Sequence, residues 1–124
     1  MAAQCEVICV CVPGPPEMQA VTVGAGGILE GVTRDTVLRL AAQLELRAEE
    51  RAVDPTELYV ADELFFVGTH AEVMPISEID HYRVGEGGPG PVTRRLQSAY
   101  DDVVRGRAQA PAGWHTPVYA KVTA

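Results

Sequence analysis

The sequence has almost no lysine and an excess of acid. Lys121 is the only lysine. The chain has 17 acidic and 10 basic residues, which gives a formal net charge of −7. A surface that binds nucleic acid needs clustered lysine and arginine to meet the phosphates. We therefore expect no nucleic-acid partner.

Long hydrophobic runs are missing as well. No segment has the uninterrupted apolar length of a membrane span. Residues 1–11 show neither a basic leader region nor a cleavage-site pattern, so no signal peptide is predicted. We expect a cytoplasmic protein with no membrane partner.

The three cysteines lack the spacing of a metal or redox motif. Cys5, Cys9 and Cys11 contain no C-x-x-C pair, although alternate residues of a strand share one face. A thiolate metal site or a redox pair is one interpretation, and three small hydrophobic residues on a core strand is the simpler one. We predict no metal site.

The length and the apolar content of the chain are typical of one domain, or of part of a larger one. The chain has 124 residues, and 47% of them are apolar, enough for a core. Short apolar runs alternate irregularly with segments of helical periodicity, which predicts an α/β or α+β fold with a mixed sheet. The expected strands are residues 6–12, 19–23, 45–52, 63–67, 73–79 and 81–84, and the expected helices are 33–44, 54–61 and 91–106.

The first candidate site is the turn at residues 31–33, just before the first expected helix. Free backbone N–H groups and the helix dipole attract a phosphate at such a position. The Thr33 hydroxyl is suited to bind an oxyanion, and simple capping of the helix is the alternative.

The second candidate site is the turn at residues 68–71, which follows an apolar strand. Ligands often bind where strands end and loops gather. Thr69 offers a hydroxyl, Gly68 permits close approach of the backbone, and His70 offers an imidazole. A tight turn with an exposed histidine is the alternative.

A third string, residues 85–90, fits G-x-G-x-x-G. No second strand with a ribose-binding acid follows, and Pro89 removes a backbone donor, so a connecting loop is the better interpretation. The sequence contains neither G-x-S-x-G nor H-E-x-x-H. The scattered acids show no metal-ligand spacing and are typical of a solvated face.

Taken together, these strings resemble one family, the class IV (fold-type IV) aminotransferases that use pyridoxal phosphate, with the branched-chain amino acid enzymes as the best match. The matching strings are G-I-L-E-G-V-T-R-D at 27–35, E-L-Y-V-A-D-E-L-F-F at 57–66, G-T-H-A-E-V-M-P-I at 68–76, G-P-V-T and L-Q within 90–97, and Gly113–Trp114. They occur in the family's order from about residue 27 to residue 114.

The resemblance implies a site for pyridoxal 5'-phosphate. The phosphate would lie on the amides of Val32 and Thr33, with the hydroxyls of Thr33 and Thr69, and Leu29 would pack on the ring. The turn amides of Thr69, His70 and Ala71 would receive the substrate carboxylate. Glu6 would pair with the pyridine nitrogen.

The sequence departs from the family in three ways. His70 stands where alanine is usual, and Val7 replaces an asparagine beside Glu6. Lys121 matches no family position, so the Schiff-base lysine is absent and no catalytic residue is assigned. We interpret residues 1–124 as part of the carboxyl-terminal cofactor-binding domain, with the small amino-terminal domain missing.

Three hypotheses remain open from the sequence. The chain is part of an aminotransferase that moves an amino group between a branched-chain amino acid and 2-oxoglutarate, and it is inactive alone. Otherwise it is a non-catalytic module that binds pyridoxal phosphate, or a remnant. The third hypothesis is a cysteine hydrolase using His70, His81 or His115, for which the sequence has no local signature. A half-domain exposes apolar area, so we expect a homo-oligomer or a complex with an amino-terminal half.

Overall fold

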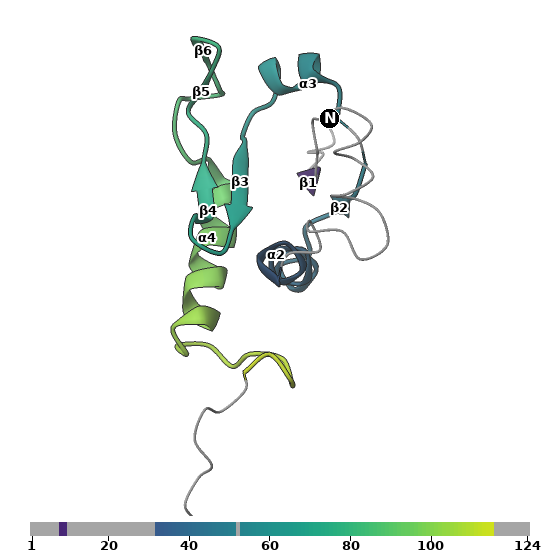
Figure 1. The fold of residues 1–124 in the computed structure, drawn as a ribbon, viewed down its shortest axis with the longest axis vertical. Coiled ribbons are helices and arrows are strands. Elements are labelled where there is room, and N and C mark those ends of the chain that lie inside the picture. The colour runs from purple at the N-terminus through teal and green to yellow at the C-terminus, as the bar shows by residue number, and fades with distance from the viewer. Residues whose placement is uncertain (1–7, 10–31, 52, 116–124) are drawn as a thin grey trace, which may run out of the picture.

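The computed structural model describes residues 8–9, 32–51 and 53–115 (Figure 1). The elements are β1 Ile8–Cys9, α2 Val32–Gln43, β2 Ala48–Glu49, α3 Pro55–Tyr59, β3 Phe65–Gly68, β4 Glu72–Pro75, β5 Glu78–Ile79, β6 Tyr82–Arg83 and α4 Pro91–Val104. The expected strand at 19–23 lies outside the described residues. The elements otherwise follow the predicted order, with their ends shifted by a few residues.

The core forms where α2 and α4 pack against the β3–β4 hairpin. Three apolar residues of α2, Val37, Leu40 and Ala41, are almost inaccessible, as the helical spacing predicts. On α4, Leu96 is fully buried, but Val104 is 50% exposed. The apolar spacing of the helix predicts a buried stripe that includes Val104. For Val104 this prediction is wrong, because the residue falls in the last turn of α4.

The β3–β4 hairpin presents two different faces. The strands are antiparallel, with Phe66 opposite Met74 and Val67 opposite Val73. Val73 is buried, and Phe65 and Val67 pack on the core. Phe66 is 50% exposed on the other face. The apolar L-F-F-V run at 64–67 predicts a buried strand, and within the described residues this holds for one face only.

The remaining strands are short pairs. β1 pairs with β2 in parallel, and β5 pairs with β6 antiparallel. The turn between β5 and β6 is two residues long, and Asp80 and His81 have φ of 48° and 66°. Positive φ at both positions is the mark of a type I′ turn, which suits the twist of a hairpin. The single strand expected at 73–79 is instead two strands, β4 and β5, separated by residues 76–77.

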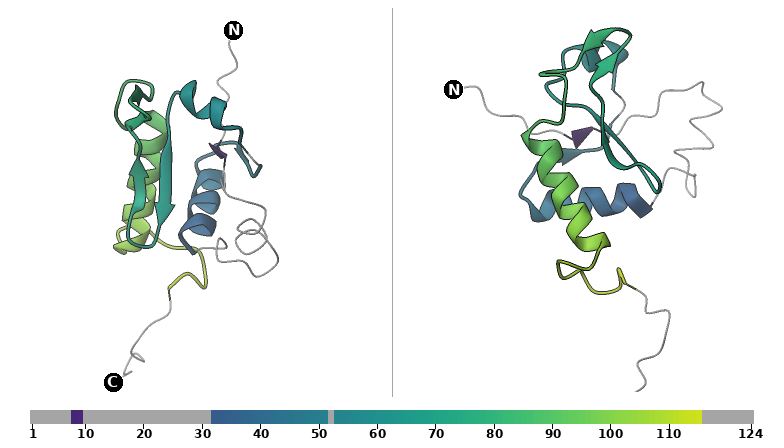
Figure 2. Two further views of the ribbon diagram at one scale, coloured as in Figure 1. Left: turned by 45° about the horizontal axis from the view of Figure 1, so that its top comes forward. Right: turned by 90° about the vertical axis from the view of Figure 1, so that its left-hand side faces the viewer.

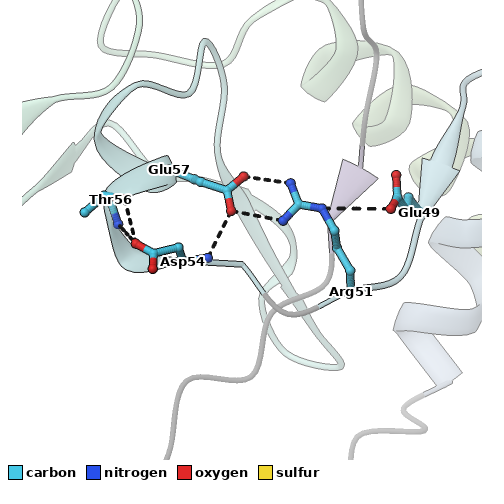
Figure 3. Close-up of polar contacts among 5 residues, drawn as sticks. All are labelled: Glu49, Arg51, Asp54, Thr56 and Glu57. Atoms are coloured by element: carbon cyan, nitrogen blue, oxygen red, sulfur yellow. Dashed lines mark hydrogen bonds and ion pairs between the residues drawn. The ribbon is translucent and has the colours of Figure 1, made fainter.

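α3 begins with the capping box that its sequence predicts (Figure 3). The Asp54 carboxylate accepts from the Thr56 backbone N–H at 2.8 Å, and the Glu57 carboxylate accepts from the Asp54 N–H at 3.1 Å. Arg51 donates two bonds to Glu57, of 3.0 and 2.7 Å, and its Nε lies 4.0 Å from Glu49. The hydrogen bonds from Arg51 lower the pKa of Glu57 to about 2.

Candidate functional site

The first part of the candidate site is the beginning of α2. The helix starts at Val32, and the Thr33 side chain is 6% exposed. The first backbone N–H groups of a helix have no partner within the helix, so they are available to an anion or a cap. Leu29 and Glu6, which were assigned to the same site, lie outside the described residues.

Arg34 adds a positive charge to this first turn, and it is not among the site residues predicted from the sequence. Its guanidinium forms an ion pair with Glu50, and the side chain is 24% exposed. Its Nε is buried and has no hydrogen-bond partner within the described part of the chain. The T-R-D string marked this position, but the string alone did not show that the guanidinium turns toward Glu50.

The second part is the turn between β3 and β4. Gly68 pairs with Glu72, so three residues make the connection. Thr69 and His70 are exposed, and Ala71 is half-buried. A Cβ at Gly68 would meet only the Ala71 Cβ, at 3.9 Å, which is ordinary contact. The described packing therefore does not require glycine at position 68.

The structure brings these two parts together. β3 packs against α2, and both views in Figure 2 place the β3–β4 turn beside the end of α2 at which the helix begins. Segments separated by more than 30 positions in the chain thus share one edge of the molecule. The first N–H groups of α2 and the exposed Thr69 hydroxyl are neutral donors, which suit an anionic ligand.

The glycine-rich loop at 85–90 has a different role. A Cβ at Gly90 would lie 2.1 Å from the Glu63 Cδ, and a Cβ at Gly85 would lie 2.0 Å from the Asp62 carbonyl oxygen. These glycines leave room for the segment that leads into β3. The preference for a connecting loop over a dinucleotide site agrees with this packing.

Glu63 also occupies the beginning of α4. Its carboxylate accepts from the Val92 N–H at 3.1 Å, from the Thr93 N–H at 2.8 Å and from the Thr93 hydroxyl at 2.6 Å. Burial raises the pKa of Glu63, but the hydrogen bonds from Thr93 and Val92 outweigh it, and the pKa is lowered overall. This helix start already holds an anion from its own chain, whereas within the described residues no carboxylate caps α2.

Metal sites and membrane-spanning helices were also sought in the described parts of the chain. Residues 8–9, 32–51 and 53–115 contain no group of three His, Cys, Asp or Glu side chains that could hold a metal ion. No helix in these ranges has the length and apolar character needed to cross a membrane. Cys5 and Cys11 lie outside the described residues.

Comparison with known proteins places this geometry in a family. The model of the family "Amino-transferase class IV" matches residues 19–79. The branched-chain-amino-acid aminotransferase of Pseudomonas aeruginosa is 49% identical over 90 residues, which are 73% of this chain and 29% of that protein. The chain belongs to the class IV aminotransferases.

Solved structures of the family show the same fold. The branched-chain amino acid aminotransferase of Thermobaculum terrenum in its PLP form is 55% identical, with a TM-score of 0.62 over 66% of this chain and 27% of that one. The branched-chain amino acid aminotransferase from Escherichia coli is 40% identical, with a TM-score of 0.64 over 68% of this chain and 28% of that one. The predicted fold-type IV, mixed α/β class is therefore confirmed, and the chain spans less than a third of these relatives.

The residues at the candidate site fit pyridoxal phosphate on their chemistry. The helix start offers main-chain N–H groups and a buried threonine hydroxyl, the donors that a phosphate takes. The exposed Thr69 hydroxyl adds a second donor group at the same edge.

Proposed function

We propose that this chain is the cofactor-binding part of a branched-chain amino acid aminotransferase, within the carboxyl-terminal domain of the fold. One observation carries the proposal: the start of α2 and the β3–β4 turn lie side by side, at two of the strings that the family shares (Figure 2). The relatives' names supply the substrate class. The reaction would move an amino group between a branched-chain amino acid and 2-oxoglutarate.

The hydrogen-bond donors that the residues offer suggest the role of each in binding the cofactor or the substrate. The amides of Val32 and Thr33 and the hydroxyls of Thr33 and Thr69 would hold the cofactor phosphate. Leu29 would contact the ring, and Glu6 would face the ring nitrogen. The turn amides of Thr69, His70 and Ala71 would orient the substrate carboxylate. Pyridoxal phosphate, when bound, supplies an electron sink for charge at the substrate α-carbon.

The chain alone would bind but not turn over substrate. Transamination needs an amine that takes up and returns the proton at the α-carbon, and Lys121 is the only lysine. The missing lysine would come from the part of the relatives that the match leaves out, with assembly into an oligomer or with an amino-terminal half. A non-catalytic pyridoxal phosphate module is the alternative that the single lysine favours. The cytoplasmic location stays a prediction from the sequence.

Titration with pyridoxal phosphate tests the site. Thr33→Val removes the buried hydroxyl at nearly constant volume, and Thr36→Val makes the same change further along α2. A hydrogen bond to a charged group contributes about 1.5–3 kcal/mol, so Thr33→Val should weaken binding roughly tenfold or more. Affinity for pyridoxal, which lacks the phosphate, should not change. Equal loss in both variants, or no loss in Thr33→Val, would contradict the phosphate site.

A further inference from the structure

The first turn of α2 carries an ion pair that the proposed phosphate site does not use. The Arg34 guanidinium donates to the Glu50 carboxylate, and the side chains are 24% and 54% exposed. The Nε of Arg34 is buried, so the guanidinium is held against the protein rather than free in solvent. Salt screens a partly buried pair less than a pair on the open surface. The charges of this pair therefore act on groups nearby.

The course of the chain after α2 explains how Glu50 reaches this turn. α2 has 12 residues, which is a length of about 18 Å. The segment 44–50 covers up to roughly 20 Å when extended. β2 contacts α2, so the segment runs back along the helix and brings Glu50 to the turn that holds Arg34. Glu50 is thus 16 positions from Arg34 in the chain and next to it in the fold.

The pair lies where its charges affect an anion at the helix start. Side chains on a helix lean toward its beginning, which brings the Arg34 charge near the free N–H groups of Val32 and Thr33. A positive charge there favours a bound phosphate, and a negative charge opposes it. Asp35, the other charged residue of this turn, pairs with Arg39 at 2.8 Å, so these two charges offset each other.

We propose that the Arg34–Glu50 pair sets the affinity of this helix start for a phosphate, with Arg34 raising the affinity and Glu50 lowering it. The two side chains act through the potential at the first N–H groups of α2 and are not catalytic residues. This inference rests on the phosphate site of the proposed function and adds the charges that regulate it.

A purely structural role of the pair predicts a different result. Arg34→Gln and Glu50→Gln both break the ion pair, so a structural role predicts that both variants weaken binding. Charges that act at a distance predict opposite effects. At about 10 Å and an effective dielectric constant of about 60, one unit charge changes the affinity for a phosphate dianion by roughly fivefold.

Titration calorimetry with the whole 124-residue chain distinguishes the two roles. The ligand is pyridoxine 5'-phosphate, whose alcohol group forms no adduct with Lys121, and pyridoxine is the control without a phosphate. Arg47→Gln and Glu78→Gln are the matched control variants. Arg47 is exposed beyond the far end of α2, and Glu78 lies on β5, away from α2 in Figure 1. Circular dichroism checks that every variant folds.

The expected changes have opposite signs. Pyridoxine 5'-phosphate should bind roughly fivefold more weakly to Arg34→Gln and roughly fivefold more tightly to Glu50→Gln. The double variant should bind about as tightly as the unchanged chain, because the two effects add. Both shifts should shrink at about 1 M salt. The control variants should leave the affinity unchanged, and pyridoxine should bind all variants equally.

The inference is overturned if the two single variants change the affinity in the same direction or leave it unchanged. Shifts that persist at high salt, or that are equal for pyridoxine, also overturn it. If this happens while Thr33→Val still weakens the binding of pyridoxine 5'-phosphate, the role of the pair is wrong and the phosphate site stands. If the unchanged chain does not bind pyridoxine 5'-phosphate, both are wrong.

Discussion

Replacing Glu63 tests how the hairpin that carries the candidate site is fixed to α4. Glu63 lies two residues before β3 and reaches 29 to 30 positions along the chain to the start of α4. Glu63→Ala removes three hydrogen bonds from one carboxylate. It also leaves the Thr93 hydroxyl, in a residue with no exposed surface, without this acceptor.

The expected loss of stability follows from these contacts. Loss of a helix cap costs about 1 kcal/mol, and an unsatisfied buried polar group costs about 1–3 kcal/mol. Because Glu63 is half-buried and solvent compensates in part, we expect roughly 2–3 kcal/mol for Glu63→Ala. Glu63→Gln keeps one acceptor oxygen and should lose about half of that.

Urea unfolding measures the effect. The fluorescence of Trp114, the only tryptophan, reports on the transition, because its ring packs on the core. Gly90→Ala gives an independent readout, since its Cβ would displace the Glu63 carboxyl. Its cost should therefore largely vanish in the Glu63→Ala background. Gly88→Ala is the control, because a Cβ at Gly88 meets nothing within 4 Å.

The pH dependence follows from the lowered pKa of Glu63. Its carboxyl titrates below the ordinary value of 4.5 in the folded chain. The stabilisation is therefore complete above about pH 4.5 and is lost as the pH falls through the folded pKa. The stability difference between the unchanged chain and Glu63→Gln should shrink below about pH 4.5. A difference that is constant from about pH 7 to about pH 3, or additive costs of Glu63→Ala and Gly90→Ala, would refute this account.

Three further outcomes are expected. Leu96→Ala leaves a cavity in the fully buried centre of α4 and should cost about 2–5 kcal/mol in urea unfolding; a cost below about 1 kcal/mol would contradict the assigned core. Arg39→Gln removes the guanidinium that lies 6.0 Å from the Trp114 ring and should change the Trp114 emission while lowering stability by at most about 1 kcal/mol. The purified chain with pyridoxal phosphate should show no transamination of leucine with 2-oxoglutarate, and turnover that survives Lys121→Ala would contradict the need for an outside lysine.

Local features of the fold could be predicted from the sequence, because they depend on neighbouring residues. The spacing of Val37, Leu40 and Ala41 predicted the buried face of α2, and all three are buried. The Asp54, Pro55 and Glu57 pattern predicted the start of α3, and both bonds of the capping box are present. Both features involve residues within one or two helical turns of each other, whose side chains and backbone are close together in any helix.

Contacts between distant segments could not be predicted in the same way. No pattern near Glu63 shows that it caps α4, since the two are 29 positions apart and only the folded chain brings them together. The parallel pairing of β1 with β2 also depends on a long connection. For the candidate site, the two turns could be named from their residues, but their position side by side depends on the packing of α2 against β3.

The L-F-F-V run at 64–67 predicts both a local strand and the contacts of that strand with distant segments. Its apolar character on both faces predicts a strand covered on both sides, and that is a statement about surroundings rather than about the strand itself. In the described structure Val67 and Phe65 have their cover and Phe66 does not. The local pattern thus carries information about a layer that the described residues do not supply. The candidate site lies at the turn that ends this same strand, so the packing of Phe65 and Val67 on the core, with β3 against α2, also positions that turn.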